Sequence, residues 1–117
     1  MWKKLYAFTF KSLIKFVVAN YYVMTVLQIE HKVLNYIGWK KAFDSDPINR
    51  KRSGVRRHRI IRPNNDPDYV IVQMEFNSLQ EAESALAALR KVWANVEGKI
   101  MTNPQTRIFD IAGAIDY

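Results

Sequence analysis

The chain has 117 residues, no cysteine, and 18 basic against 11 acidic residues, which give a formal net charge of +7. This length suits one compact domain with a real core, and the composition excludes disulfides, thiolate metal sites and a cysteine nucleophile. Two histidines cannot form a three-histidine metal site, so we expect no metal. No P-loop, dinucleotide-binding glycine motif or serine-hydrolase motif occurs, and we expect no cofactor.

Residues 1–23 form a predicted N-terminal extension with a basic amphipathic pattern. On a helical wheel Lys3, Lys4, Lys11 and Lys15 share one side, and the opposite side is apolar. Such a helix can lie on an anionic membrane surface or pack on a partner. The internal lysines argue against a spanning helix and against a signal peptide. We favour a packing or non-functional extension over membrane contact, and expect a cytoplasmic protein.

The remaining residues, 24–117, form one predicted domain that begins with a strand and a helix. Residues 25–33, TVLQIEHKV, alternate apolar and more polar side chains, as expected of a strand with two different faces. Asn35 can then cap a helix on which Trp39 and Phe43, four residues apart, share a face. Pro47 predicts that this helix ends close to it.

The net charge is confined to residues 50–62, RKRSGVRRHRIIR. Seven of these thirteen residues are Lys or Arg, and the rest of the chain, with 11 basic and 11 acidic residues, is neutral. Residues 55–62 predict a strand that forms a hairpin with the strand 69–76, YVIVQMEF, around the turn 64–68. Parity puts Arg57 and Arg59 on one face of this strand, and the adjacent Ile60 and Ile61 leave open which face that is. If it is the face turned away from the helices, we expect Glu30 and Glu75 to pair with these arginines.

Three interpretations of this basic segment compete. We favour a solvated, partly ion-paired strand. A second interpretation is a patch that steers an anionic small ligand toward a pocket. A third is nucleic-acid binding, which we disfavour because no recognition helix, RNA-binding aromatic pair or zinc module accompanies the charge.

The last part of the domain predicts a helix and a strand. Ser78 and Glu81 have the spacing of a capping box. An apolar stripe follows at helical spacing, formed by Leu79, Ala82, Leu86, Leu89 and Trp93. Residues 106–111, TRIFDI, predict a short final strand. The resulting order, β-α-β-β-α-β with a four-stranded antiparallel sheet, is the ferredoxin-like α+β plan.

Particular residues extend this interpretation to a family. The run from His31 to Leu86 resembles the dimeric α+β barrel superfamily, near its antibiotic-biosynthesis-monooxygenase-like and cyclase-like members. The features that carry the likeness are His31-Lys32-Val33, Trp39-Lys40 with Phe43-Asp44, the basic strand after Gly54, the Asp66-Pro67 turn and the capped helix after Glu75. The resemblance covers roughly Thr25 to Ile111.

The resemblance implies a homodimer in which two sheets pack face to face into a barrel, with the helices outside. It also implies a pocket between the sheet and helices of one protomer, for a small apolar, aromatic or polyketide-like ligand. Some relatives oxidise polycyclic aromatics without metal or flavin, others degrade haem or cyclise polyketides, and no haem ligand can be placed here. The alternative is a non-catalytic dimeric ligand-binding or stress-related module.

Six residues are the candidate site. His31, on the helix-facing side of its strand, is the candidate catalytic residue, because a histidine exchanges a proton near neutral pH. The candidate substrate-binding residues are Trp39, Phe43, His58, Met74 and Trp93. Each also has a plain structural interpretation, since aromatic residues at helical spacing and a histidine at the core edge commonly serve packing alone.

Overall fold

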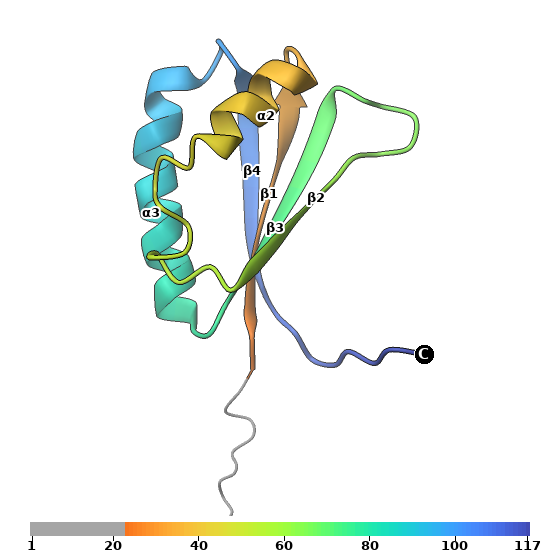
Figure 1. Ribbon diagram of the computed structural model, residues 1–117, viewed down its shortest axis with the longest axis vertical. Coiled ribbons are helices and arrows are strands. Elements are labelled where there is room, and N and C mark those ends of the chain that lie inside the picture. The colour runs from red at the N-terminus through yellow and green to blue at the C-terminus, as the bar shows by residue number, and fades with distance from the viewer. Residues whose placement is uncertain (1–22) are drawn as a thin grey trace, which may run out of the picture.

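The computed structural model describes residues 23–117, so the amphipathic pattern of residues 1–22 lies outside the described part. The elements in chain order are β1 (Thr25–Val33), α2 (Tyr36–Asp44), β2 (Arg57–Ile61), β3 (Tyr69–Phe76), α3 (Leu79–Val96) and β4 (Met101–Asp110). The predicted order of elements is confirmed (Figure 1).

One antiparallel sheet holds all four strands, in the order β2-β3-β1-β4. Both helices lie on the same side of this sheet (Figure 1). The opposite side, called the outer face below, is not covered by any element of residues 23–117. The ferredoxin-like plan is therefore present, with one sheet face buried within the chain and one face open.

Side-chain alternation along the central strands assigns each residue to a face. In β3, Val72 and Met74 are each 2% exposed, whereas Gln73 and Glu75, the residues that follow them, are only half-buried. β1 alternates in the same way, and its buried set includes His31. A period of two is expected of a strand whose apolar side packs on helices, and the predicted assignment of faces is confirmed for β1 and β3.

Both helices begin where the sequence predicts. The Asn35 side chain accepts a hydrogen bond from the Gly38 amide at 2.8 Å, and the Ser78 hydroxyl accepts one from the Glu81 amide at 3.2 Å. Each bond satisfies an amide that the first helical turn leaves without a partner. α2 ends at Asp44, ahead of Pro47, as expected.

Two details differ from the prediction. Leu79 was expected in the buried stripe of α3 but is 51% exposed, whereas Ala85 is buried. Leu79 is the first residue of the helix, and helical side chains point toward the N-terminus, which takes this one past the packed turns. β4 begins at Met101, five residues earlier than expected, because the Asn103-Pro104 pair looks like a turn in the sequence. β4 is an edge strand, where proline's missing amide is tolerated.

Candidate functional site

An apolar cavity of about 180 Å³ lies between the helices and the sheet. Four of the five predicted substrate-binding residues line it: Trp39, Phe43, Met74 and Trp93. The remaining wall comes from the C-terminal half of α3, the loop that follows α2, and the start of β4. The fold thus brings together four predicted residues from α2, β3 and α3, of which Trp39 and Trp93 are 54 positions apart.

An aromatic row on α2 forms one side of this cavity and connects it to both histidines. Tyr36, Trp39 and Phe43 share one helical face, with ring centroids 5.8 Å apart for the first pair and 5.2 Å for the second. His31 meets the Trp39 ring edge-on at 5.8 Å, and His58 meets the Phe43 ring edge-on at 5.2 Å. Neither histidine lines the cavity itself.

His31 is enclosed in the core layer of the protein, with 3% of its surface exposed. Its Nδ1 lies 2.9 Å from the Lys32 carbonyl oxygen, which can only accept, so Nδ1 holds the proton of the neutral ring. Burial lowers the pKa of His31 below its usual 6.5, because the charged imidazolium loses water there. Near neutral pH the ring is therefore uncharged, with Nε2 as its unprotonated nitrogen.

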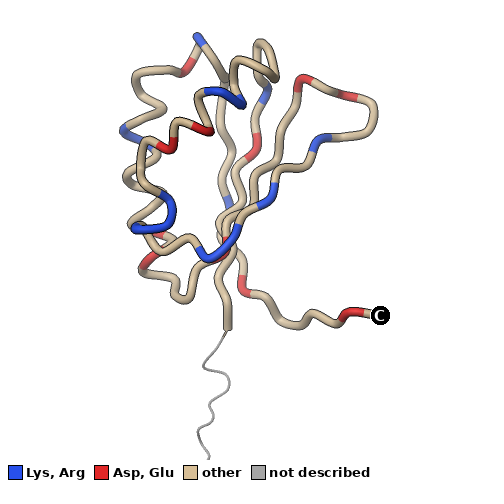
Figure 2. Tube along the Cα trace, viewed as in Figure 1, with Lys and Arg blue, Asp and Glu red and all other residues tan. Residues whose placement is uncertain are grey.

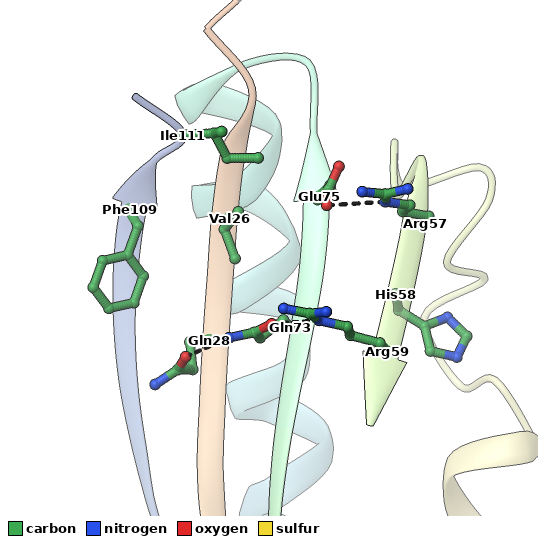
Figure 3. A pocket seen from close by; sticks show the side chains of 9 residues that line it. All are labelled: Val26, Gln28, Arg57, His58, Arg59, Gln73, Glu75, Phe109 and Ile111. Atoms are coloured by element: carbon green, nitrogen blue, oxygen red, sulfur yellow. Dashed lines mark hydrogen bonds and ion pairs between the residues drawn. The ribbon is translucent and has the colours of Figure 1, made fainter. Parts of the chain in front are cut away.

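His58 lies on β2 opposite Met74, on the side of the sheet that faces the helices. It is an edge-strand residue and remains exposed to water. In Figure 3 its ring points away from the outer-face side chains of Arg57 and Arg59. Desolvation, followed by the positive charges of Arg50 and Lys40, lowers the pKa of His58.

The loop between α2 and β2 contains half of the basic segment and has a defined fold. The Asp46 carboxylate accepts a hydrogen bond from the Arg50 amide at 2.8 Å, and the Ser53 hydroxyl donates to the Ile48 carbonyl at 2.7 Å. Gly54 has φ +101°, and a Cβ there would come within 2.8 Å of the Glu81 carboxylate on α3. The segment is therefore a fixed turn packed on the second helix.

A hollow of about 490 Å³ with basic walls opens beside this loop. Its lining residues are Asp46, Arg50, Lys51, Val55, Arg56, Arg57 and His58. Four of these are Lys or Arg and one is acidic, so the hollow, called the basic hollow below, has an excess of positive charge. Figure 2 shows the corresponding blue stretches along the chain between α2 and β2.

Arg50 belongs to both spaces, since it lines the apolar cavity as well as the basic hollow. Its guanidinium carbon lies 4.0 Å from the centre of the Phe43 ring, a cation–π contact. In the sequence Arg50 is one of seven Lys and Arg residues in the segment 50–62. Nothing in the local pattern marks it, because its position depends on how the loop folds back after α2.

A chain of hydrogen bonds crosses the outer face (Figure 3). Arg59 Nε donates to Gln73 Oε1 at 2.8 Å, and Gln73 Nε2 donates to Gln28 Oε1 at 2.9 Å. Gln28 Nε2 then donates to one oxygen of Glu30 at 3.0 Å, and the Tyr69 hydroxyl donates to the other at 2.8 Å. Side chains of β2, β3 and β1 are thus linked in series.

The predicted ion pairs on this face are confirmed in part. Arg57 Nε lies 3.0 Å from Glu75 Oε2, as expected. Arg59 bonds to Gln73 instead of an acidic residue, because the register places these two residues opposite each other. Glu30 lies one strand further away, on β1, and takes the Tyr69 hydroxyl as a partner. This hydrogen bond is the main reason that the pKa of Tyr69 is raised.

The outer face also holds an apolar end. Val26 pairs in register with Phe109, and both line a hollow of about 560 Å³ together with Ile111, Gln28, Gln73, Glu75, Arg57 and Arg59 (Figure 3). His58 on the edge strand β2 also borders this hollow, although its ring points the other way. Within residues 23–117, no group of three His, Asp or Glu residues is placed to hold a metal ion. No helix in that range is long and apolar enough to cross a membrane.

Comparison with known proteins gives no match to any family model and none to any curated protein sequence. Solved structures do match. SnoaB, a cofactor-independent oxygenase from Streptomyces nogalater, superposes with a TM-score of 0.66 at 12% identity, over 81% of this chain and 99% of its own. The chain has the ferredoxin-like fold of such proteins. The fold predicted from the sequence is thereby confirmed.

Two further structures share this ferredoxin-like fold. A provisionally assigned antibiotic biosynthesis monooxygenase from Nitrosomonas europaea matches with a TM-score of 0.60 at 16% identity, over 76% of this chain and 90% of its own. A dimeric ferredoxin-like protein from an uncultured marine organism matches with a TM-score of 0.58 at 12% identity, over 80% of this chain and 99% of its own. At these identities the likeness concerns the fold.

Proposed function

We propose that this protein binds a small aromatic molecule in the apolar cavity between its sheet and its helices. The observation that carries this proposal is the cavity itself, whose walls include two tryptophans and a phenylalanine, Trp39, Trp93 and Phe43. Aromatic side chains of this kind stack on flat ligands and exclude water around them. Met74 adds a flexible, polarisable contact from the sheet.

The size of the cavity limits the ligand. An apolar cavity of about 150 Å³ takes up benzene, and most pockets for drug-sized ligands occupy about 300–1,000 Å³. A cavity of about 180 Å³ therefore accepts one aromatic ring. A polycyclic polyketide requires the pocket to widen, so we favour the small aromatic ligand among the two classes expected from the sequence.

We further propose oxygenase-like chemistry, by analogy with SnoaB, which is a cofactor-independent oxygenase. In such a reaction the substrate supplies the reactivity, and the protein supplies a dry site and a fixed orientation. His31 is the proposed proton-handling residue. It contacts Trp39 rather than the cavity, so it acts on a bound ligand only where the ligand reaches past that ring.

The third part of the proposal is a homodimer formed through the outer face. The polar side chains there already bond to one another, so a partner that covers them leaves fewer donors and acceptors unsatisfied than it would on an unbonded polar face. The apolar end at Val26, Phe109 and Ile111 gains from the same cover. One of the matching structures is itself described as dimeric. A cytoplasmic location stays a prediction.

A cavity-filling substitution tests the ligand site. We expect 4-ethylbenzamide, a one-ring neutral probe, to raise the melting temperature of the unaltered protein. Val92→Phe adds a ring to the cavity wall and should abolish that rise. Leu79→Phe is the matched control, because Leu79 lies on the same helix but is 51% exposed and lies outside the cavity. An unchanged thermal shift in the Val92→Phe protein would place the ligand elsewhere.

Oxygen uptake separates the two functional alternatives. An oxygenase consumes oxygen and ligand together, whereas a non-catalytic binding module binds the ligand and leaves it intact. If a bound phenol is recovered unchanged and no oxygen is consumed, the result favours the binding module. If turnover is found, His31→Ala should reduce it without reducing ligand binding, and unchanged turnover would remove His31 from the mechanism.

A further inference from the structure

We infer that the ligand is an aromatic anion, a small aromatic carboxylate or a molecule of the same shape and charge, bound across two adjoining spaces. Its ring occupies the apolar cavity, and its anionic group occupies the basic hollow beside the loop between α2 and β2. This inference rests on the proposed function, because the ring needs the cavity. It adds the chemical class of the ligand and a second subsite.

Arg50 connects the two spaces. Among residues 23–117, Arg50 alone lines both the apolar cavity and the basic hollow. Its side chain is 15% exposed, and its guanidinium lies against the Phe43 ring, whose neighbour in the aromatic row is Trp39. A ligand ring beside Phe43 and Trp39 therefore directs a substituent toward this guanidinium.

The Arg50 guanidinium has hydrogen-bonding capacity to spare. It carries five N–H donors. Nη1 donates to the Phe43 carbonyl at 2.9 Å, and the distance from Nη1 to the Asp46 carboxylate, 3.6 Å, exceeds a hydrogen bond. Within residues 23–117 the side chain makes no other hydrogen bond. The remaining donors suit a carboxylate, which accepts two parallel bonds from one guanidinium.

The charge around the hollow also favours an anion. Asp46 is offset by Arg50, and Arg57 is paired with Glu75. Lys51 and Arg56 have no acidic partner within residues 23–117, and residues 1–22 contain no Asp or Glu that could supply one. Two positive charges thus stay uncompensated at the wall of a concave surface, which concentrates the field on a small anion.

The arrangement favours a small molecule over a nucleic acid. A polynucleotide is held by basic residues spread along its backbone and by exposed aromatic side chains on which bases stack. Here Lys51 and Arg56 lie at the wall of one hollow, and Trp39 and Phe43 line a cavity, with Trp39 only 5% exposed. The basic hollow and the apolar cavity share Arg50 in their walls, which suits one small ligand that contacts both.

Two probes of nearly equal shape test this inference. Binding of 4-ethylbenzoate and of the neutral 4-ethylbenzamide to the full chain is measured by isothermal titration calorimetry at low ionic strength. Hydrogen bonds to a charged group are stronger than neutral ones, so the benzoate should bind at least about tenfold more tightly. Its advantage should shrink as salt is added, because the hollow is open to solvent.

Charge-removing variants locate the anionic group. Arg56→Gln removes an exposed, uncompensated charge from the hollow and should weaken benzoate binding by about two- to fivefold, with benzamide binding unchanged. Arg52→Gln is the matched control: it removes the same charge from the same loop, outside the hollow. Lys51→Gln provides a second variant in the hollow with the same expected effect.

The outcomes separate this inference from the proposed function. If the two probes bind equally well, the ligand site stands and the anionic subsite is overturned. If Arg52→Gln weakens benzoate binding as much as Arg56→Gln, net charge rather than the hollow is responsible, and the subsite is again overturned. If neither probe binds, the proposed function falls, and this inference falls with it.

Discussion

Val72 and Gln73 are neighbours in β3, yet they belong to two different environments. Val72 is 2% exposed beneath the helices, whereas Gln73 lies in the middle of the hydrogen-bond chain that crosses the outer face. The helix-facing side is apolar and encloses the cavity; the outer face is polar at one end and apolar at the other. Alternation along a strand is thus sufficient to separate the proposed ligand site from the proposed subunit interface.

The largest effect is expected when a core side chain is removed. Phe76→Ala should lower the free energy of unfolding by about 3–5 kcal/mol, because Phe76 is fully buried and its loss leaves a cavity. Ile71→Ala, on the outer face of the same strand, should cost clearly less when the protein is dilute. Urea unfolding at several protein concentrations measures both effects.

Concentration dependence decides what Ile71 does. If the outer face is a dimer interface, the Ile71→Ala variant should lose more stability at high protein concentration than at low concentration, since association stabilises only the dimer. Equal losses from Phe76→Ala and Ile71→Ala at all concentrations would contradict the assignment of the two faces.

The next test places a charge in the outer face. Gln73→Arg breaks the hydrogen-bond chain and brings a second guanidinium beside Arg59. A buried charge left without a partner costs about 3–5 kcal/mol. The dissociation constant of the proposed dimer should therefore rise by a factor of about a hundred or more. Analytical ultracentrifugation measures the dissociation constant, and Gln80→Arg, on the exposed surface of α3, is the control. A dimer equally strong in both variants would mean that the subunits associate through another surface.

A smaller effect is expected at the loop that closes the cavity and the basic hollow. Gly54→Ala forces a side chain into φ +101° and against the Glu81 carboxylate, and should cost about 1–3 kcal/mol of unfolding free energy. Gly113→Ala has open space around it and should change stability by less than about 0.5 kcal/mol. Thermal unfolding compares the two, and equal values would show that the loop is not fixed by Gly54.

Much of this fold could be predicted from the sequence, because each element has a local cause. The alternation of residues 69–76 identifies β3, and Asn35 and Ser78 mark the starts of the helices. The edge strand β4 could not be placed correctly, since its Asn103-Pro104 pair has the composition of a turn and only pairing with β1 makes it a strand.

The candidate site was predictable to a smaller extent. Helical spacing places Trp39 beside Phe43, and strand parity directs Met74 toward the helices, so the apolar wall follows from local rules. The position of Arg50 does not, because it depends on a loop held by Asp46, Ser53 and Gly54. The partner of Arg59 was missed for a related reason: parity gives the face of a residue, and only the register gives its neighbour.

The two histidines offer the finest comparison, since they lie on the same side of the sheet with different burial. Burial lowers the pKa of His31 below 6.5, so the unfolded chain takes up a proton on this residue before the folded protein does. The stability that neutral His31 provides is therefore complete above pH 6.5 and declines as the pH falls below that value. One proton changes stability by at most about 1.4 kcal/mol per pH unit.

Urea unfolding between pH 5 and 8 of the unaltered protein, His31→Gln and His58→Gln isolates this contribution. The His31→Gln variant should show a weaker decline below pH 6.5, whereas His58→Gln should change the decline less, because His58 is exposed and the solvent screens its charge. Carboxylates contribute equally to all three proteins and cancel in the differences. The contrary result is a free energy of unfolding of His31→Gln that runs parallel to that of the unaltered protein over this pH range. In that case His31 takes up its proton as readily in the folded chain as in the unfolded one, and the assignment of a neutral ring beside Trp39 is wrong.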